Sequence, residues 1–169
     1  MCAVMNISGA DGDPRKRLRL SNPWHFLALG FGSGLSPKAP GTMGSLAALP
    51  VVWLAGQLPW LGYLLVTMLA VYAGVYICAR ASRDMGVHDH GAIVWDEVAG
   101  MLISCFLLPM TPLWLALGFL FFRFFDVLKP WPISWCDKHL HGGFGIMFDD
   151  VLAGLMAFAC LQALRYGLA

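Results

Sequence analysis

Three long stretches of the chain carry almost no charge. No charged residue occurs from Ala39 to Ala79 or from Val98 to Phe122, and a third apolar stretch runs from Val151 to Leu164. A membrane-crossing helix needs about 20 apolar residues, so the first stretch is long enough for two crossings. The pattern predicts an all-α, multi-helix integral membrane protein rather than a soluble protein with an unusually apolar core.

Turn residues divide two of these stretches. Gly-Gln-Leu-Pro occupies 56–59 in the first, and Pro109 and Pro112 interrupt the second. Because prolines inside a helix break it, each stretch is expected to form a helical hairpin. A single kinked crossing over 98–122 is the alternative. The helices expected in the first hairpin span 46–55 and 60–79.

The remaining segments are polar, and the hairpins would bring them to one face of the membrane. A helix is expected to begin at Ser21-Asn22-Pro23, with Ser or Asn as its cap and Pro in its first turn. The Gly-, Ser- and Pro-rich segment 30–45 predicts a loop. The last helix is expected from about Val151. Residues 1–20 are predicted to be a flexible basic tail, and 21–169 a single membrane-embedded domain.

Composition narrows the possible functions. The chain has 169 residues, 59% of them hydrophobic and 12% charged, and its net charge is +1. No basic patch interleaved with aromatic residues is present, so nucleic-acid binding is not expected. The five cysteines are scattered without a C-x-x-C pair, which favours neither disulfides nor a zinc site. No obligate protein partner is inferred.

The most informative polar feature is a repeated motif. HDHGAIVWDEVAGM begins at residue 88, and HLHGGFGIMFDDVLAGLM begins at 139 with a two-residue insertion. Each copy places a pair of carboxylates at the start of an apolar run, where an ionised acid is costly unless a cation or a donor satisfies it. The two pairs suggest a metal site at the membrane surface. Alternatively, the acids only complement helix N-termini.

Acidic residues are concentrated in the second half of the chain. Asp96 and Glu97 are expected in the first turn of one helix, and Asp149 and Asp150 in the first turn of another. Oxygen ligands at this density suit Mg²⁺. Asp126 follows Arg123 by three residues, so the two share a helix face. Eight of the ten acids lie within 84–150: Asp84, Asp89, Asp96, Glu97, Asp126, Asp137, Asp149 and Asp150.

Several other residues could bind a phosphate or move a proton. The loop over 30–45 offers backbone N–H groups together with Ser33, Thr42 and Lys38, and such loops can cradle a phosphate. Lys129 adds a cation suited to lipid headgroups. A histidine near the acids, such as His90, could protonate a leaving oxygen. Structural roles are equally open for the four histidines His88, His90, His139 and His141.

Three long segments of the chain are specific enough to compare with known families: SNPWHFLALGFGSGLSPKAPGTMGSLAALP (21–50), DMGVHDHGAIVWDEVAGM (84–101) and RFFDVLKPWPISWCDKHLHGGFGIMFDDVLAG (123–154). They resemble the phosphatidylglycerophosphatase A family of bacterial phosphatases. The resemblance implies a Mg²⁺-dependent enzyme of the bacterial inner membrane. Its substrate would be the anionic phospholipid phosphatidylglycerophosphate, hydrolysed to phosphatidylglycerol and phosphate at the cytoplasmic face.

The residues suggest how such a site could work. Asp96, Glu97, Asp149 and Asp150 would hold one or two Mg²⁺ ions, which neutralise phosphoryl oxygens and activate a water molecule. Arg123 and Lys38 would grip the phosphate, Asp126 would orient Arg123 or bind metal, and Ser33, Thr42 and Lys129 would contribute to substrate binding. An aspartyl nucleophile remains an alternative to water.

Two other functions are considered. A small multipass carrier that moves cations would place acids within the apolar runs, whereas here they lie at the edges. A lipid phosphotransferase of the CDP-alcohol class would carry a D-G-x2-A-R motif, which this chain lacks.

Overall fold

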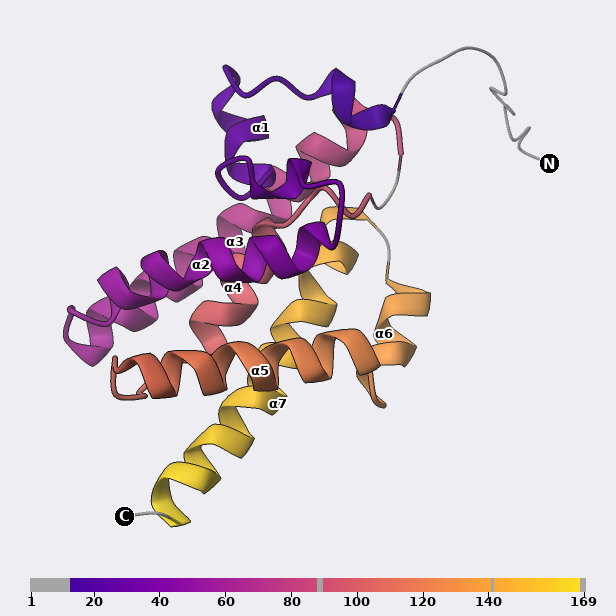
Figure 1. Cartoon of the computed structure of the whole chain (residues 1–169). Helices are drawn as coiled ribbons and strands as arrows, with labels where there is room; N and C mark the ends of the chain where they lie inside the picture. Colours follow the sequence, from indigo (N-terminus) through magenta and orange to yellow (C-terminus); the bar gives the residue numbers. More distant parts are fainter. Residues whose placement is uncertain (1–12, 88–89, 141, 168–169) are drawn as a thin grey trace.

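The computed structural model describes residues 13–87, 90–140 and 142–167, and all regular structure in these segments is helical. Two helices, α3 and α7, are long and apolar enough to cross a membrane. The predicted all-α fold class is confirmed (Figure 1). The elements are η1 (Pro14–Arg17), α1 (Pro23–Ala28), η2 (Ser33–Leu35), α2 (Pro40–Ala55), α3 (Trp60–Met85), α4 (Trp95–Ser104), α5 (Pro112–Leu128), α6 (Ile133–His139) and α7 (Gly142–Gly167).

Both predicted hairpins are present. The turn at 56–59 joins α2 to α3, and α4 ends at Ser104, well before α5 begins at Pro112. The kinked-helix alternative for 98–122 is therefore wrong. Thr111 caps α5 by accepting a hydrogen bond from the Trp114 N–H (3.5 Å), and Pro112 at the first helical position favours a new start there.

Two helices begin earlier than the sequence suggested. α2 begins at Pro40 rather than Leu46, so the predicted loop over 30–45 is six residues too long. α7 begins at Gly142 rather than near Val151, so Asp149 and Asp150 lie in its interior and not in its first turn. In both cases glycine-rich sequence forms helix, because neighbouring elements pack where a side chain would otherwise stand.

The start of the described chain is folded against α3. Residues 1–12 of the predicted tail lie outside the described part, but from Asp13 onward the chain makes specific contacts. The Arg17 guanidinium donates to the Met85 carbonyl (2.9 Å), and the Arg19 N–H donates to Nδ1 of His25 (2.9 Å). The predicted helix start is confirmed, since Asn22 caps α1 by accepting from the Trp24 N–H (3.0 Å).

The short helix α4 occupies the centre of the bundle, packed against α2, α3, α5 and α7 (Figure 1). Its contact with α7 is close, because a Cβ on Gly154 would lie 2.7 Å from the Gly100 carbonyl oxygen. The outer surface is strongly apolar. On α3, for example, Leu69 is 66% exposed and Tyr72 is 83% exposed. Large apolar surfaces of this kind indicate contact with lipid.

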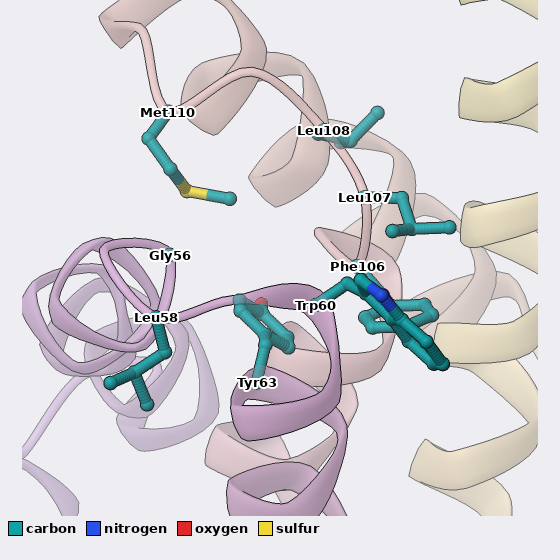
Figure 2. Close-up of a pocket in the computed structure, with 8 residues that line it drawn as sticks. All are labelled: Gly56, Leu58, Trp60, Tyr63, Phe106, Leu107, Leu108 and Met110. Atoms are coloured by element: carbon teal, nitrogen blue, oxygen red, sulfur yellow. The ribbon is translucent and has the colours of Figure 1, made fainter.

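The two hairpin turns meet at the end of the bundle opposite the start of α4. They enclose a cleft of about 170 Å³ (Figure 2). The α4–α5 loop is fastened from α7, where Gln162 donates to the Phe106 carbonyl (2.8 Å) and Arg165 donates to the Leu107 carbonyl. The cleft is lined by Gly56, Leu58, Trp60, Tyr63, Phe106, Leu107, Leu108 and Met110.

Candidate active site at the ends of α4, α5 and α7

Four carboxylates from α4, α5 and α7 gather around that of Asp150. Asp150 is only 4% exposed, and the charges of the other four act on it electrostatically. As predicted, Asp96 and Glu97 lie in the first turn of α4. We call this group the acidic cluster: Asp96, Glu97, Asp126, Asp149 and Asp150.

Arg123 of α5 is held on one side of the acidic cluster. Its Nη1 donates to both oxygens of Glu97 (2.8 and 2.9 Å) and to Asp126 (2.5 Å). The Ser45 hydroxyl of α2 donates to Glu97 Oε2 (2.5 Å). Burial raises the pKa of Glu97 to about 7, and the charge of Asp126 adds to that shift, against the opposing effects of Arg123 and Ser45. Together, Glu97 and Asp126 fix the position of the guanidinium.

Lys129 links α5, α6 and α7 through two acidic side chains. Its Nζ donates to Asp149 (2.7 Å) and to Asp137 (2.7 Å). Although burial by itself lowers the pKa of Lys129, these two bonds hold it above its ordinary value. Lys129 also ends α5 with a left-handed backbone conformation, φ +41°. Arg123 and Lys129, two of the three cations predicted to bind the substrate, therefore both contact the acidic cluster, whereas Lys38 does not.

The donor atoms around Asp150 fit a hard divalent cation. Asp150 Oδ2 is buried and has no hydrogen-bond partner among the described residues. The cluster carries five carboxylates, and only Arg123 and Lys129 pair with it among the described cations. An excess of buried carboxylate oxygens is the donor set that Mg²⁺ prefers. In the described part of the chain, no three His, Cys, Asp or Glu side chains are already arranged as a metal site.

The remaining predicted residues lie outside this group of contacts. The Ser33 hydroxyl donates to the Gly30 carbonyl within its own turn (2.8 Å), and Lys38 is exposed. Thr42 is half-buried in the first turn of α2. His90 is half-buried, and its Nδ1 accepts from the Ala92 N–H (3.1 Å). Residues 88, 89 and 141, which include two of the candidate histidines, lie outside the described part.

Three contributors to the site were missed by the sequence analysis: Gly41, Ser45 as a partner of Glu97, and Asp137 as a partner of Lys129. A Cβ on Gly41 would overlap Glu97 Oε1 and lie 3.2 Å from Arg123 Nη1. The signal was Pro40 followed by small residues at positions 41, 44 and 45, which is also the pattern of a helix that begins at proline and packs closely.

Comparison with known proteins gives one family. The profile of the family described as phosphatidylglycerophosphatase A matches residues 26–165. The chain is 56% identical to phosphatidylglycerophosphatase A of Escherichia coli (strain K12) over 148 residues, covering 87% of this chain and 86% of that protein. It is 47% identical to phosphatidylglycerophosphatase A of Haemophilus influenzae over 158 residues, covering 92% and 97%.

A more distant relative carries another name. A putative phosphatidylinositol-3-phosphatase of Bacteroides thetaiotaomicron is 34% identical over 150 residues, covering 83% of this chain and 92% of that protein. No solved structure matches the chain significantly.

Proposed function

Because the chain belongs to the phosphatidylglycerophosphatase A family, it is a phosphatase, and we propose that the acidic cluster is where it acts on phosphatidylglycerophosphate. The reaction removes the terminal phosphate monoester and leaves phosphatidylglycerol and inorganic phosphate. The single observation that carries the placement is Asp150, a buried carboxylate with an unpartnered oxygen beside four further acids. A buried charge without a partner is costly, so it indicates a functional site rather than a structural one.

Mg²⁺ is the proposed cofactor, held by Asp96, Glu97, Asp149 and Asp150. When bound, it would neutralise phosphoryl oxygens and lower the pKa of a water molecule. Glu97 is already bonded to Ser45 and Arg123, so its contribution also includes holding the guanidinium.

Arg123 and Lys129 are the two cations proposed to contact the phosphate. Each of them is fixed by two carboxylates. Fixed donors stabilise developing negative charge without reorganising during the reaction. Asp126 orients Arg123, and the exposed Lys38 is proposed to meet the incoming headgroup.

A proton for the leaving oxygen is proposed to come from His90. Its Nδ1 accepts a hydrogen bond from the backbone, so in the neutral ring the proton resides on Nε2. Ser33 and Thr42 remain proposed contacts of the substrate at the edge of the site.

We also propose that the protein crosses the bacterial inner membrane several times with this site facing the cytoplasm. The supporting feature is the shared location of its polar segments. The described N-terminal elements, the start of α4 and the end of α5 all lie away from the two hairpin turns (Figure 1).

The decisive experiment measures phosphate release from phosphatidylglycerophosphate by the purified full chain, with Mg²⁺ and then with a chelator. Asp150→Asn keeps the shape of the side chain and removes its charge, so activity should fall about 100-fold or more. Asp13→Asn is the matched control, because Asp13 pairs with Arg15 and lies outside the acidic cluster. Phosphatidic acid and phosphatidylinositol 3-phosphate serve as competing substrates.

Thermal unfolding of the same variants gives a readout that does not depend on turnover. A ligand that binds only the folded state raises Tm, so Mg²⁺ should stabilise the wild type and not Asp150→Asn. Without Mg²⁺ the variant should be the more stable protein, because it removes a buried acid that lies beside four other acids. Wild-type turnover in Asp150→Asn would exclude Asp150 from the site.

A further inference from the structure

We propose that residues 13–38, which we call the N-terminal cap, form a docking surface for anionic phospholipid headgroups and concentrate the lipid substrate beside the acidic cluster. This inference rests on the proposed function, since it assigns a role to a surface that meets the same lipid. The cap comprises η1, α1, η2 and the loop that follows.

The cap is a folded structure held on the end of α3. Both ring nitrogens of buried His25 are engaged: Nδ1 accepts from the Arg19 N–H, and Nε2 donates to Asp84 (2.9 Å). Leu18 is buried against the same helix end, next to the bond from Arg17 to the Met85 carbonyl. The backbone that carries the charged side chains of the cap is therefore held in a fixed position.

The surface of the cap combines positive charge with exposed apolar side chains. It contains five Lys or Arg residues and a single acid, Asp13, which pairs with Arg15 (2.6 Å). Lys16 and Arg19 are exposed and pair with no acid in the described part of the chain. The large apolar side chains exposed in the cap are Leu20, Trp24, Phe26, Phe31 and Leu35.

This combination selects a lipid surface over other anionic partners. Cations near an anionic leaflet each contribute attraction to its headgroups, and apolar side chains beside them enter the interfacial region. A nucleic acid would leave the apolar residues in water. The cap also adjoins α3, a helix of membrane-spanning length, and the ring of Trp24 packs against Tyr76 of that helix (5.2 Å between centroids).

The cap lies directly beside the start of α4. The Val94 N–H donates to the Ala28 carbonyl (2.8 Å), and Val94 immediately precedes the turn that carries Asp96 and Glu97. Gly34 approaches the Ala92 backbone so closely that a side chain would not fit. A lipid held by the cap is therefore adjacent to the start of α4.

The arrangement solves an electrostatic difficulty. The substrate is an anion, and without Mg²⁺ the acidic cluster has more carboxylates than paired cations, so the metal-free cluster does not attract the headgroup. A basic surface next to it raises the local concentration of anionic lipid. The cap should therefore affect the interfacial KM, and the acidic cluster the kcat.

The test uses the purified full chain in mixed micelles of phosphatidylcholine with phosphatidylglycerophosphate at varied mole fraction. The variant Lys16→Gln/Arg19→Gln removes two unpaired cations of the cap. At low salt its interfacial KM should rise about five- to thirtyfold with kcat unchanged, as expected from about 1 kcal/mol per cation near an anionic surface. In about 1 M salt the wild type should approach the variant, because screening is then nearly complete.

Two controls separate docking from structural damage. Lys16→Arg/Arg19→Lys keeps both charges and should behave as wild type, and Lys138→Gln removes an exposed cation outside the cap and should leave KM unchanged. An unchanged KM in the Gln variant, or a fall in its kcat, would overturn the docking role. Failure of the wild type to release phosphate would instead overturn the proposed function.

Discussion

Gly41 connects the packing of α2 to the geometry of the acidic cluster. Its Cα faces the ion pair of Glu97 and Arg123, and a Cβ at this position would overlap a carboxylate oxygen. Ser45, one turn later, donates to the same carboxylate. A glycine followed after four positions by serine therefore lets α2 come close enough to fix Glu97, which in turn fixes Arg123.

Gly41→Ala is expected to displace the ion pair while leaving every charge in place. Because Arg123 then moves away from the phosphate, kcat should fall about tenfold to a hundredfold, as misplacement by about 1 Å does in other enzymes. Phosphate release from phosphatidylglycerophosphate measures the effect. Gly167→Ala is the control, since a Cβ there meets nothing within 4 Å. Full activity in Gly41→Ala would show that the pair does not need its observed position.

The sequence predicted the positions of the acids better than it predicted which residues form hydrogen bonds with them. Asp96 and Glu97 could be placed in a first turn because they directly precede a long apolar run. The pairing of Arg123 with Asp126 followed from their spacing on a helix. The bond from Ser45 to Glu97 joins residues 52 positions apart, and no local pattern encodes that contact.

At the level of elements, the hairpins were predictable and two helix starts were not. Gly56 to Pro59 and the pair Pro109 and Pro112 break helices for local reasons, so the sequence alone indicates both turns. The early starts of α2 and α7 depend on tertiary packing. Glycines that would weaken an isolated helix are compensated here by close contact, as where Gly143 lies against the α3 backbone at Val75.

The hydrogen bonds that hold the α4–α5 loop to α7 lead to a prediction about thermal stability. Gln162 donates to the Phe106 carbonyl, and a carbonyl left unpaired in an apolar environment costs about 1–3 kcal/mol. Gln162→Leu should therefore lower Tm in detergent, with activity below the transition unchanged, because the loop lies at the far end of α4 from the acidic cluster. Gln57→Leu is the matched control and should lower Tm less, because Gln57 also donates to a carbonyl but is exposed. Equal Tm values for the two variants would contradict the fastening role.

At the scale of the whole molecule, charge is segregated along the bundle. Of the eleven Lys and Arg residues, only Arg165 lies near the end where the hairpins turn. The site itself lies partway along α3, since Trp95 donates to the Ala70 carbonyl (3.0 Å) and α3 continues to Met85, about 22 Å further. The N-terminal cap packs against that end of α3, through contacts such as the bond from Arg17 to the Met85 carbonyl.

This segregation predicts the orientation of the protein in the membrane. Lys and Arg accumulate on cytoplasmic faces, so the end with ten of the eleven cations should face the cytoplasm and the hairpin turns the opposite side. The side of the membrane on which each end lies can be measured with three single substitutions, Lys16→Cys, Lys138→Cys and Gln57→Cys, because all three positions are exposed. A membrane-impermeant maleimide should label the first two only in inverted vesicles and the third only in right-side-out vesicles, after the labelling of the native cysteines has been subtracted.

Labelling of Lys16→Cys and Lys138→Cys from opposite sides would place the N-terminal cap and α6 on opposite sides of the bilayer. A lipid phosphate could not then reach the cap and Lys129 from one leaflet, and the shared site would have to be abandoned.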